Sequence, residues 1–468
     1  MSAQTPSTDS APGGLRRALG LPEATTLVAG GIVGASIFLL PAAVADIAGG
    51  PWLALTIWGI AGLVAACSAL SFAELGAAIP QTGGAYVHLK RAFRSHFLGF
   101  SYGWMMLFGY GSAALAVVSI MASGYLSGLI TAAGFEPPPE RAMAIAMILT
   151  VAGLNTIGVK ASGRAQIVLT ATKFGLLILL VAVPLLTIGG DPAALSHPGP
   201  ERTPGELIGV ITDGLLLCFF SFSGAYFVTQ VAGELRNPQR DIPRAIALGF
   251  GAVLILYLLF NLVCILVLPF DQLRNSDRIA ADVMRQAVGE PGAILVAIAI
   301  IISALGVLNA QLLSYPRVVF ALAQDGLLPS FVAKVHERSR TPYLAVIAVT
   351  ICACLYAASG SYRNILSAVG FVSHLFTVLA VVGLMVLRFR EPDLPRPYRV
   401  RPYPWAPLVF IAISAIYLGN LLVTRFEQSM IGLLIVAVGA PVYFFRRSKI
   451  PRSIEAEAAQ AAAAPAAD

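Results

Sequence analysis

The chain consists, almost from end to end, of long apolar runs separated by short polar segments. A helix needs about 20 mostly apolar residues to cross the roughly 30 Å hydrocarbon core of a bilayer. Of the 468 residues, 57% are hydrophobic and 12% are charged, whereas soluble domains carry about 25% charged residues. Helices in lipid must be apolar on their outer faces as well, and they satisfy their backbone groups internally. The sequence therefore predicts an all-α membrane protein.

Twelve apolar runs predict twelve transmembrane helices. In the first half of the chain the predicted spans cover residues 25–47, 52–79, 98–131, 141–158, 166–188 and 207–234. In the second half they cover residues 243–268, 291–323, 342–358, 365–388, 405–423 and 430–445. The third and eighth runs are long enough to tilt or to extend beyond the lipid. A short amphipathic stretch, residues 85–97, separates the second span from the third.

Basic residues divide unevenly between the two sides of this predicted bundle. If the N-terminus lies inside, the inner segments carry 23 of the 31 Lys and Arg residues and the outer segments carry 7. Lys and Arg concentrate in cytoplasmic loops, so both termini are expected in the cytoplasm of a cell whose inner membrane holds the protein. Residues 1–22 and 448–468 are expected to be disordered cytoplasmic tails. The formal net charge of +7 then reflects membrane topology, and no nucleic-acid partner is expected.

One basic residue, Lys173, lies in the middle of the fifth predicted span. It follows Arg164 by nine residues, which is about 14 Å of helix at 1.5 Å per residue. A lysine at this depth is costly and indicates a functional site. The alternative is that its side chain reaches back to the interface, but the lysine stem is too short for this depth.

Two spans contain clusters of small residues that favour an interrupted helix. The first span contains Gly-Gly-Ile-Val-Gly-Ala-Ser-Ile-Phe at residues 30–38, and the sixth contains Phe-Phe-Ser-Phe-Ser-Gly-Ala-Tyr at residues 219–226. An interrupted helix can direct free N–H groups at a carboxylate and free carbonyls at an amine. Tight helix packing through the pair Gly30 and Gly34 is the alternative. Two interruptions five spans apart favour an inverted repeat of five plus five helices.

Four stretches carry a resemblance to a known family: residues 30–38, 73–86, 234–245 and 388–398. The second includes Ala-Glu-Leu-Gly and Ile-Pro-Gln-Thr-Gly-Gly-Ala-Tyr, and the fourth includes Glu-Pro-Asp-Leu-Pro-Arg-Pro-Tyr. With these motifs the chain resembles the amino acid–polyamine–organocation superfamily, in particular bacterial amino acid permeases and the light chains of heteromeric amino acid transporters. The resemblance implies a leucine-transporter-like fold. Residues 23–390 would form its ten-helix inverted repeat with broken helices 1 and 6, and residues 391–447 would form two peripheral helices.

The resemblance also implies a substrate site between the two broken helices. The substrate carboxylate would meet backbone N–H groups of Gly34, Ala35 and Ser36, and its amine would meet carbonyls of Ile32 and of residues 220–222. Phe220 would close over the substrate as a gate, and Lys173 would take the place of a sodium ion. Because a buried lysine can give up its proton, we further expect Lys173 to couple transport to protons. The substrate-binding residues implied are Ile32, Gly34, Ala35, Ser36, Phe220, Ser221, Phe222, Gly224 and Ser373.

Four further polar residues lie in or near the predicted core. Ser303 and Asn309 in the eighth span face the Lys173 region or join helices through hydrogen bonds. For His374 in the tenth span there are two interpretations: it titrates during transport, or it is a hydrogen-bonded structural histidine. For Asp213 there are also two interpretations: it attracts a cationic substrate from outside, or it is a solvated charge near the start of its helix.

These features predict a secondary active transporter of amino acids that works by alternating access. It would be sodium-independent and either proton-coupled or an exchanger. A carrier of polyamines or ethanolamine and, from other classes, a nutrient sensor or a membrane enzyme are the alternatives. The sequence contains no P-loop and no metal-ligand spacing among its five cysteines, so no enzyme activity, metal or cofactor is expected. No sequence feature demands a protein partner.

Overall fold

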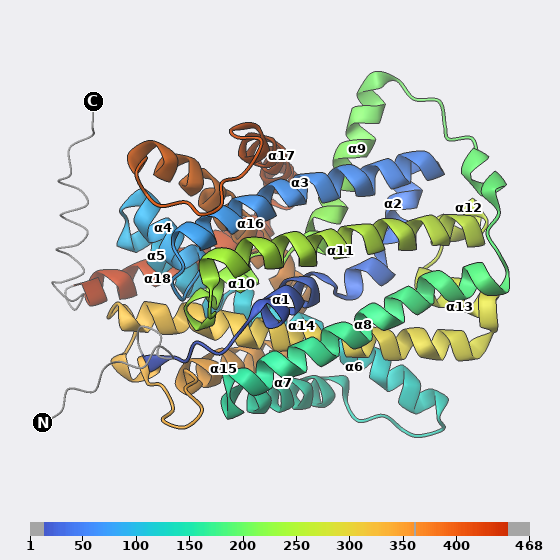
Figure 1. Cartoon of the computed structure of the whole chain (residues 1–468). Coiled ribbons are helices and arrows are strands. Elements are labelled where there is room, and N and C mark those ends of the chain that lie inside the picture. Colours follow the sequence, from blue (N-terminus) through green and yellow to red (C-terminus); the bar gives the residue numbers. More distant parts are fainter. Residues whose placement is uncertain (1–13, 360–361, 448–468) are drawn as a thin grey trace, which may run out of the picture.

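The computed structural model describes residues 14–359 and 362–447, excepting the side chains of Phe220 and of residues 362–369. In this part of the chain the regular elements are helices, and a β-bridge joins Leu19 to Leu235. Figure 1 shows the long helices running between two ends of the molecule. The short helix α4 (Ala85–Phe93) and the last turn of α18 (Phe426–Arg446) lie at one end, called here the terminal end. The short helices α12 (Phe270–Arg274) and α13 (Ile279–Val288) lie at the other, the loop end.

The first half of the chain begins with α1 (Leu21–Ile32), η2 (Ala35–Phe38), α2 (Leu40–Ala48) and α3 (Pro51–Ala78). It continues with α4 (Ala85–Phe93), α5 (His96–Phe108), α6 (Tyr110–Ala132), α7 (Glu140–Ile157) and α8 (Val159–Thr187). The segment around the second interruption contains η3 (Pro192–Ser196), α9 (Pro204–Phe219), η4 (Phe220–Phe222), α10 (Phe227–Gln230) and η5 (Ala232–Glu234).

The second half contains α11 (Pro238–Val267), α12 (Phe270–Arg274), α13 (Ile279–Val288), α14 (Glu290–Gln324), η6 (Ser330–Ala333) and α15 (Tyr343–Ser359). It ends with α16 (Tyr362–Arg390), α17 (Trp405–Thr424) and α18 (Phe426–Arg446). The predicted amphipathic stretch at 85–97 corresponds to α4. The predicted third span, 98–131, is divided into α5 and α6 at Gly109, which lies between the two helices.

Nine helical segments among the described residues are long and apolar enough to cross a membrane. They make the protein a multi-pass membrane protein. The apolar helix α15 is shorter, at 17 residues, and each of the two interrupted segments is divided into helices too short to count. The predicted number of twelve spans and the five-plus-five repeat therefore stay predictions.

The two interruptions predicted by the sequence are present. After Ile32 the chain leaves the helix through Val33 and Gly34 and enters the 3-10 helix η2. After Phe219 it passes through η4 and an irregular stretch before α10. The helices α8 and α14 pack against α1.

The interruptions face each other across a glycine contact. Gly224 has a φ of +120°, and a Cβ built on it would lie 2.8 Å from the carbonyl carbon and oxygen of Gly31. Only glycine adopts this backbone conformation readily, and only glycine leaves the two backbones room to approach. Glycine at position 224 is therefore required by its contact with Gly31.

Buried and partly buried ion pairs join helices toward the terminal end. Arg317 of α14 donates from Nε to Glu234 Oε1 at 2.7 Å, and both side chains are fully buried. Arg388 of α16 donates from Nε to Glu74 Oε1 at 2.8 Å. Lys90 and Asp325 form a third pair. These contacts join α3 to α16, η5 to α14, and α4 to the end of α14.

Candidate substrate-binding site

The interruption after α1 borders an internal cavity of about 250 Å³. Most of its wall is aliphatic and comes from α2, α6 and α14. Four of the residues implied by the resemblance, Ile32, Gly34, Ala35 and Ser36, lie on this wall. The remaining lining residues are Gly31, Leu39, Leu40, Tyr110, Ala114, Val117, Val118, Met121, Ala122, Ser223, Phe227, Ile300, Ala304, Val307 and Gln311.

The chain conformation at this wall places the start of a short helix beside the cavity. The first N–H groups of a helix have no partner within the helix, and η2 begins at Ala35 beside the cavity. N–H groups in this arrangement bind anionic groups such as carboxylates. The predicted contact of a carboxylate with residues 34–36 is therefore chemically possible in this geometry.

Lys173 lies directly behind the interruption. Its Nζ donates to the carbonyl oxygens of Gly30 at 2.6 Å and Val33 at 2.9 Å, and the side chain is 1% exposed. These carbonyls belong to the last turn of α1 and to the residue after it, where the interruption removes the usual helical partners. Gly306 of α14 leaves space for the ammonium, because a Cβ there would lie 3.0 Å from Nζ. The alternative, in which the lysine side chain reaches back to the membrane interface, does not fit these contacts.

Of the two polar residues predicted near Lys173, one shares its contact and one does not. Ser303 donates from Oγ to the carbonyl of Val33 at 3.0 Å, which is one of the two carbonyls that Lys173 contacts. Asn309 instead donates to the carbonyl of Ser162 at 3.1 Å and to Oε1 of Gln166 at 2.7 Å. Asn309 therefore joins α14 to α8, which is the second of its two predicted roles.

A tyrosine that the sequence did not single out bridges the two interruptions. Tyr257 of α11 donates from its hydroxyl toward the carbonyls of Ile32 at 3.3 Å and Ser221 at 3.5 Å. Both carbonyls were predicted to receive the substrate amine. The sequence signal for this contact was the hydroxyl of Tyr257 within the predicted seventh span. Tyrosines are too common in apolar spans for one of them to identify such a contact.

The segment η4 contains two phenylalanines, and the structure describes the side chain of Phe222 but not that of Phe220. Phe222 is buried among Trp58, Phe250 and Tyr257, with ring centroids 6.0, 5.8 and 5.4 Å away. It therefore packs in the core. The side chain of the predicted gate, Phe220, lies outside the described residues, so its role stays a prediction.

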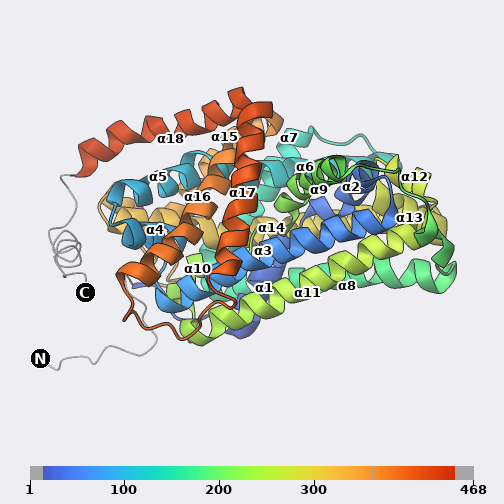
Figure 2. The same ribbon diagram turned by 90° about the horizontal axis from the view of Figure 1, so that it is seen from above.

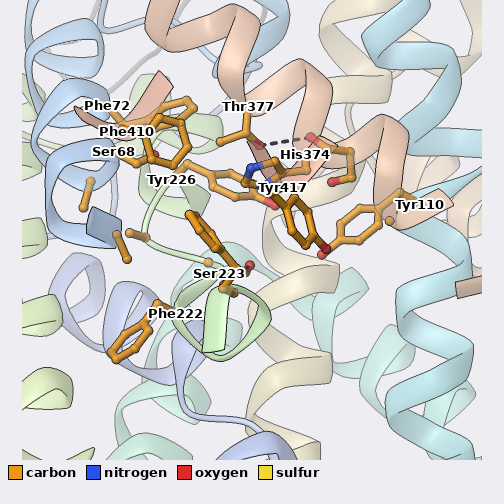
Figure 3. Close-up of a pocket in the computed structure, with 17 residues that line it drawn as sticks. Ser68, Phe72, Tyr110, Phe222, Ser223, Tyr226, His374, Thr377, Phe410 and Tyr417 are labelled. Carbon is orange, nitrogen blue, oxygen red and sulfur yellow. Dashed lines mark hydrogen bonds between the residues drawn. The ribbon is translucent and has the colours of Figure 1, made fainter. Parts of the chain in front are cut away.

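A second, smaller cavity of about 90 Å³ lies on the other side of the second interruption. Figure 3 shows Ser223, Tyr226, His374, Thr377 and Tyr417 around it. The predicted residues Gly224, Ser373 and His374 line this cavity, together with Phe222. The other lining residues are Ala65, Ser68, Ala69, Phe72, Tyr110, Phe219, Ser223, Ala225, Tyr226, Gly370, Thr377, Phe410 and Tyr417. Asp213 is exposed on α9 and lines neither cavity, which agrees with a solvated charge.

Comparisons with known proteins identify the family. Residues 19–440 match the family model described as amino acid permease. The serine/threonine exchanger SteT of Bacillus subtilis is 30% identical over 438 residues, covering 92% of this chain and 97% of that protein. The human large neutral amino acids transporter small subunit 2 is 29% identical, covering 95% of this chain and 83% of that protein. The human Asc-type amino acid transporter 1 is 28% identical, covering 93% and 84%. The chain therefore belongs to the amino acid permease family, a family of transporters, as the resemblance of its motifs predicted.

Proposed function

We propose that this protein is a secondary active transporter that moves neutral amino acids by alternating access. The observation that carries the proposal is the interruption of α1, whose residues 34–36 border a cavity of about 250 Å³ inside the bundle. The substrate's carboxylate binds the N–H groups of these residues. Its amine binds carbonyls of the two interruptions, including those that Tyr257 now contacts. As in the sequence-based prediction, Phe220 closes over the bound substrate.

The lining of the cavity favours an amino acid over an amine that lacks a carboxylate. A polyamine or ethanolamine needs acidic side chains to balance its charge in a buried site. Among the described residues that line the larger cavity none is Asp or Glu, and its polar side chains are those of Ser36, Tyr110, Ser223 and Gln311. A zwitterionic amino acid with a neutral side chain fits this lining, since backbone groups can pair with both of its charges.

The relatives support neutral substrates of different sizes. One is named for serine and threonine, and another for large neutral amino acids. The aliphatic wall formed by residues such as Leu39, Val117 and Val307 suits neutral side chains. The proposal therefore covers neutral amino acids as a class, with exchange or proton coupling as the driving mechanism.

Lys173 takes the role of a bound cation in this proposal. Its ammonium is already paired with the carbonyls of Gly30 and Val33, so transport requires no sodium ion at this position. If the ammonium loses its proton during the cycle, its hold on the interruption weakens, and a proton gradient can drive substrate movement.

Alternating access needs one end of the bundle closed while the other opens. The ion pairs Arg317–Glu234 and Lys90–Asp325 support a closed terminal end. The wall of the larger cavity includes Leu39 and Leu40, which lead toward the loop end through α2, and Ile300 in the first half of α14. We assign the terminal end to the cytoplasm, with twelve spans in the cell's inner membrane.

Uptake by the purified protein in liposomes tests this function. Labelled neutral amino acids should enter liposomes loaded with unlabelled amino acid, or enter in response to a proton gradient. Replacing sodium with choline should leave the rate unchanged. Uptake of decarboxylated amines without uptake of amino acids would overturn the proposal in favour of an amine carrier.

Replacing Lys173 tests the role of the ammonium. Lys173→Ala leaves two buried carbonyls without their donor, so uptake should fall at least about tenfold, because a hydrogen bond to a charged group is worth about 1.5–3 kcal/mol. Lys160→Ala is the matched control, because Lys160 is an exposed lysine of the same helix. Proton-dependent uptake that continued unchanged in Lys173→Ala would refute the coupling role while leaving amino acid transport intact.

A further inference from the structure

A buried imidazole in α16 carries a nitrogen atom without a hydrogen-bond partner. The Nε2 atom of His374 is buried, and none of the residues that the structure describes provides it with a partner. The rings of Phe219, Phe410 and Tyr417 surround the imidazole, with centroids 5.1, 5.9 and 4.8 Å away. An unpaired polar atom among aromatic rings is unfavourable. A phenylalanine would pack among these rings without leaving a nitrogen unpaired. The histidine therefore indicates a hydrogen-bonding partner for Nε2 other than the described residues.

The surroundings of this nitrogen are suited to a polar group. His374 lines the smaller cavity, and its wall also carries the hydroxyl groups of Ser68 and Tyr417 (Figure 3). Ser373 is a further hydroxyl-bearing residue of this wall. Thr377 already donates its hydroxyl to the carbonyl of Ser373 at 3.0 Å. By contrast, the larger cavity is lined mainly by aliphatic side chains. The two cavities thus differ in chemistry, and the smaller one is the polar compartment.

The two cavities adjoin each other at the second interruption. Tyr110 of α6 and Ser223 line both of them. Gly224, the next residue, lies against Gly31 at the interruption of α1. The polar compartment therefore adjoins the cavity in which residues 34–36 are proposed to bind the charged groups of a substrate.

Resting on the proposed function, we propose that the smaller cavity binds the polar end of a neutral substrate side chain, with His374 Nε2 as the hydrogen-bonding group. An imidazole nitrogen can accept or donate, depending on the tautomer, so a hydroxyl or a carboxamide satisfies it. Phe410 and Tyr417 belong to α17, which in this proposal forms part of the wall that determines specificity. His374 then selects among substrates by the chemistry of the side chain, and the interruption of α1 recognises the part common to all amino acids.

A comparison of threonine with valine measures this recognition, because the two side chains have nearly the same shape and differ by a hydroxyl in place of a methyl. The quantity measured is the ratio of kcat/KM for threonine to that for valine, from initial uptake into proteoliposomes. This ratio does not depend on the fraction of active protein. The wild type should favour threonine by about tenfold or more, since a site built to bind a hydroxyl rejects the analogue that lacks it. His374→Phe should bring the ratio within about threefold of one, and valine uptake should persist.

Two further variants separate recognition from general damage. His374→Asn keeps a hydrogen-bonding group and should retain part of the preference for threonine. His197→Phe makes the same replacement at a histidine outside both cavities, beside Phe270, and should leave the ratio at the wild-type value.

The outcomes distinguish this inference from the function on which it rests. Equal uptake of threonine and valine by the wild type, or an unchanged ratio in His374→Phe, overturns the role of His374 and leaves amino acid transport standing. Because the wild-type ratio alone can overturn that role, the test does not depend on whether every variant folds. Absence of uptake for every amino acid overturns the proposed function itself.

Discussion

At the scale of single residues, Gly224 illustrates how closely the two interrupted helices approach each other. Gly224→Ala would place a methyl group 2.8 Å from the carbonyl of Gly31 at a φ of +120°. We expect it to destabilise the protein by about 3 kcal/mol, because the strained backbone alone costs about 1–3 kcal/mol, and to abolish uptake. Thermal unfolding in detergent, followed by reconstitution, measures both effects.

Gly209→Ala is the matched control for this prediction. Gly209 lies in α9, and a Cβ built there meets no atom within 4 Å. Alanine is favoured over glycine in a helix by about 0.8–1.0 kcal/mol, so this variant should be as stable as the wild type or more so. Similar losses for both variants would show that the contact with Gly31 is unimportant.

His88 in α4 makes stability depend on pH. The side chain is buried, and burial lowers the pKa of His88 to about 4, whereas an exposed histidine in the unfolded chain has a pKa of about 6.5. Between these values the unfolded state binds a proton and the folded state does not, so stability is retained above about pH 6.5 and falls as the pH drops toward 4. We expect a loss of about 2 kcal/mol from His88 between pH 7 and pH 5.

Melting temperatures at pH 7, 6 and 5 measure this dependence. His88→Leu has an apolar side chain and cannot bind the proton, so its melting temperature should fall less than that of the wild type over the same range. Parallel curves for the two proteins would mean that His88 is not the titrating group.

At the scale of elements, the buried pair between Arg317 of α14 and Glu234 of η5 is the clearest link at the terminal end. Arg317→Met leaves the buried carboxylate without its partner and should cost about 3–5 kcal/mol of stability. Adding Glu234→Gln removes the orphaned charge and should recover much of the loss. Chemical or thermal unfolding of the two single variants and the double variant gives the coupling energy.

An exposed pair serves as the comparison. Arg285 pairs with Glu290 at 3.0 Å, with side chains 47% and 70% exposed. Arg285→Met should cost no more than about 1 kcal/mol. Equal costs for Arg317→Met and Arg285→Met would contradict the importance of burial for the first pair.

The pattern of apolar runs predicts most helices with small errors at their ends. The predicted spans 52–79 and 405–423 correspond to α3 and α17. The third run was predicted as one helix because apolar residues continue across Gly109, and periodicity does not report a local change of backbone direction there. Periodicity also does not report the partners of Glu74 and Glu234, whose salt bridges join residues more than 80 positions away in the chain.

At the scale of the whole molecule, the distribution of basic residues predicts which end faces the cytoplasm. Alkaline phosphatase is active only outside the cytoplasm, so a fusion after residue 190, in the segment between α8 and η3, should be active. Fusions after residue 94 and after residue 447 should be inactive, because both positions lie at the terminal end. The reverse pattern of activity would place the terminal end outside the cell.

The sequence by itself determined that the chain is a bundle of apolar helices, where two of them are interrupted, and that Lys173 is exceptional. Those properties depend on neighbours within one or two helical turns, and composition and spacing record them. Only the tertiary structure decided which carbonyls Lys173 contacts, that Asn309 joins Gln166, that Tyr257 bridges the interruptions and that His374 meets α17. Those contacts join residues distant in the chain, and they depend on how whole helices pack, because a single helix presents several faces and its sequence does not state which neighbour each face will meet.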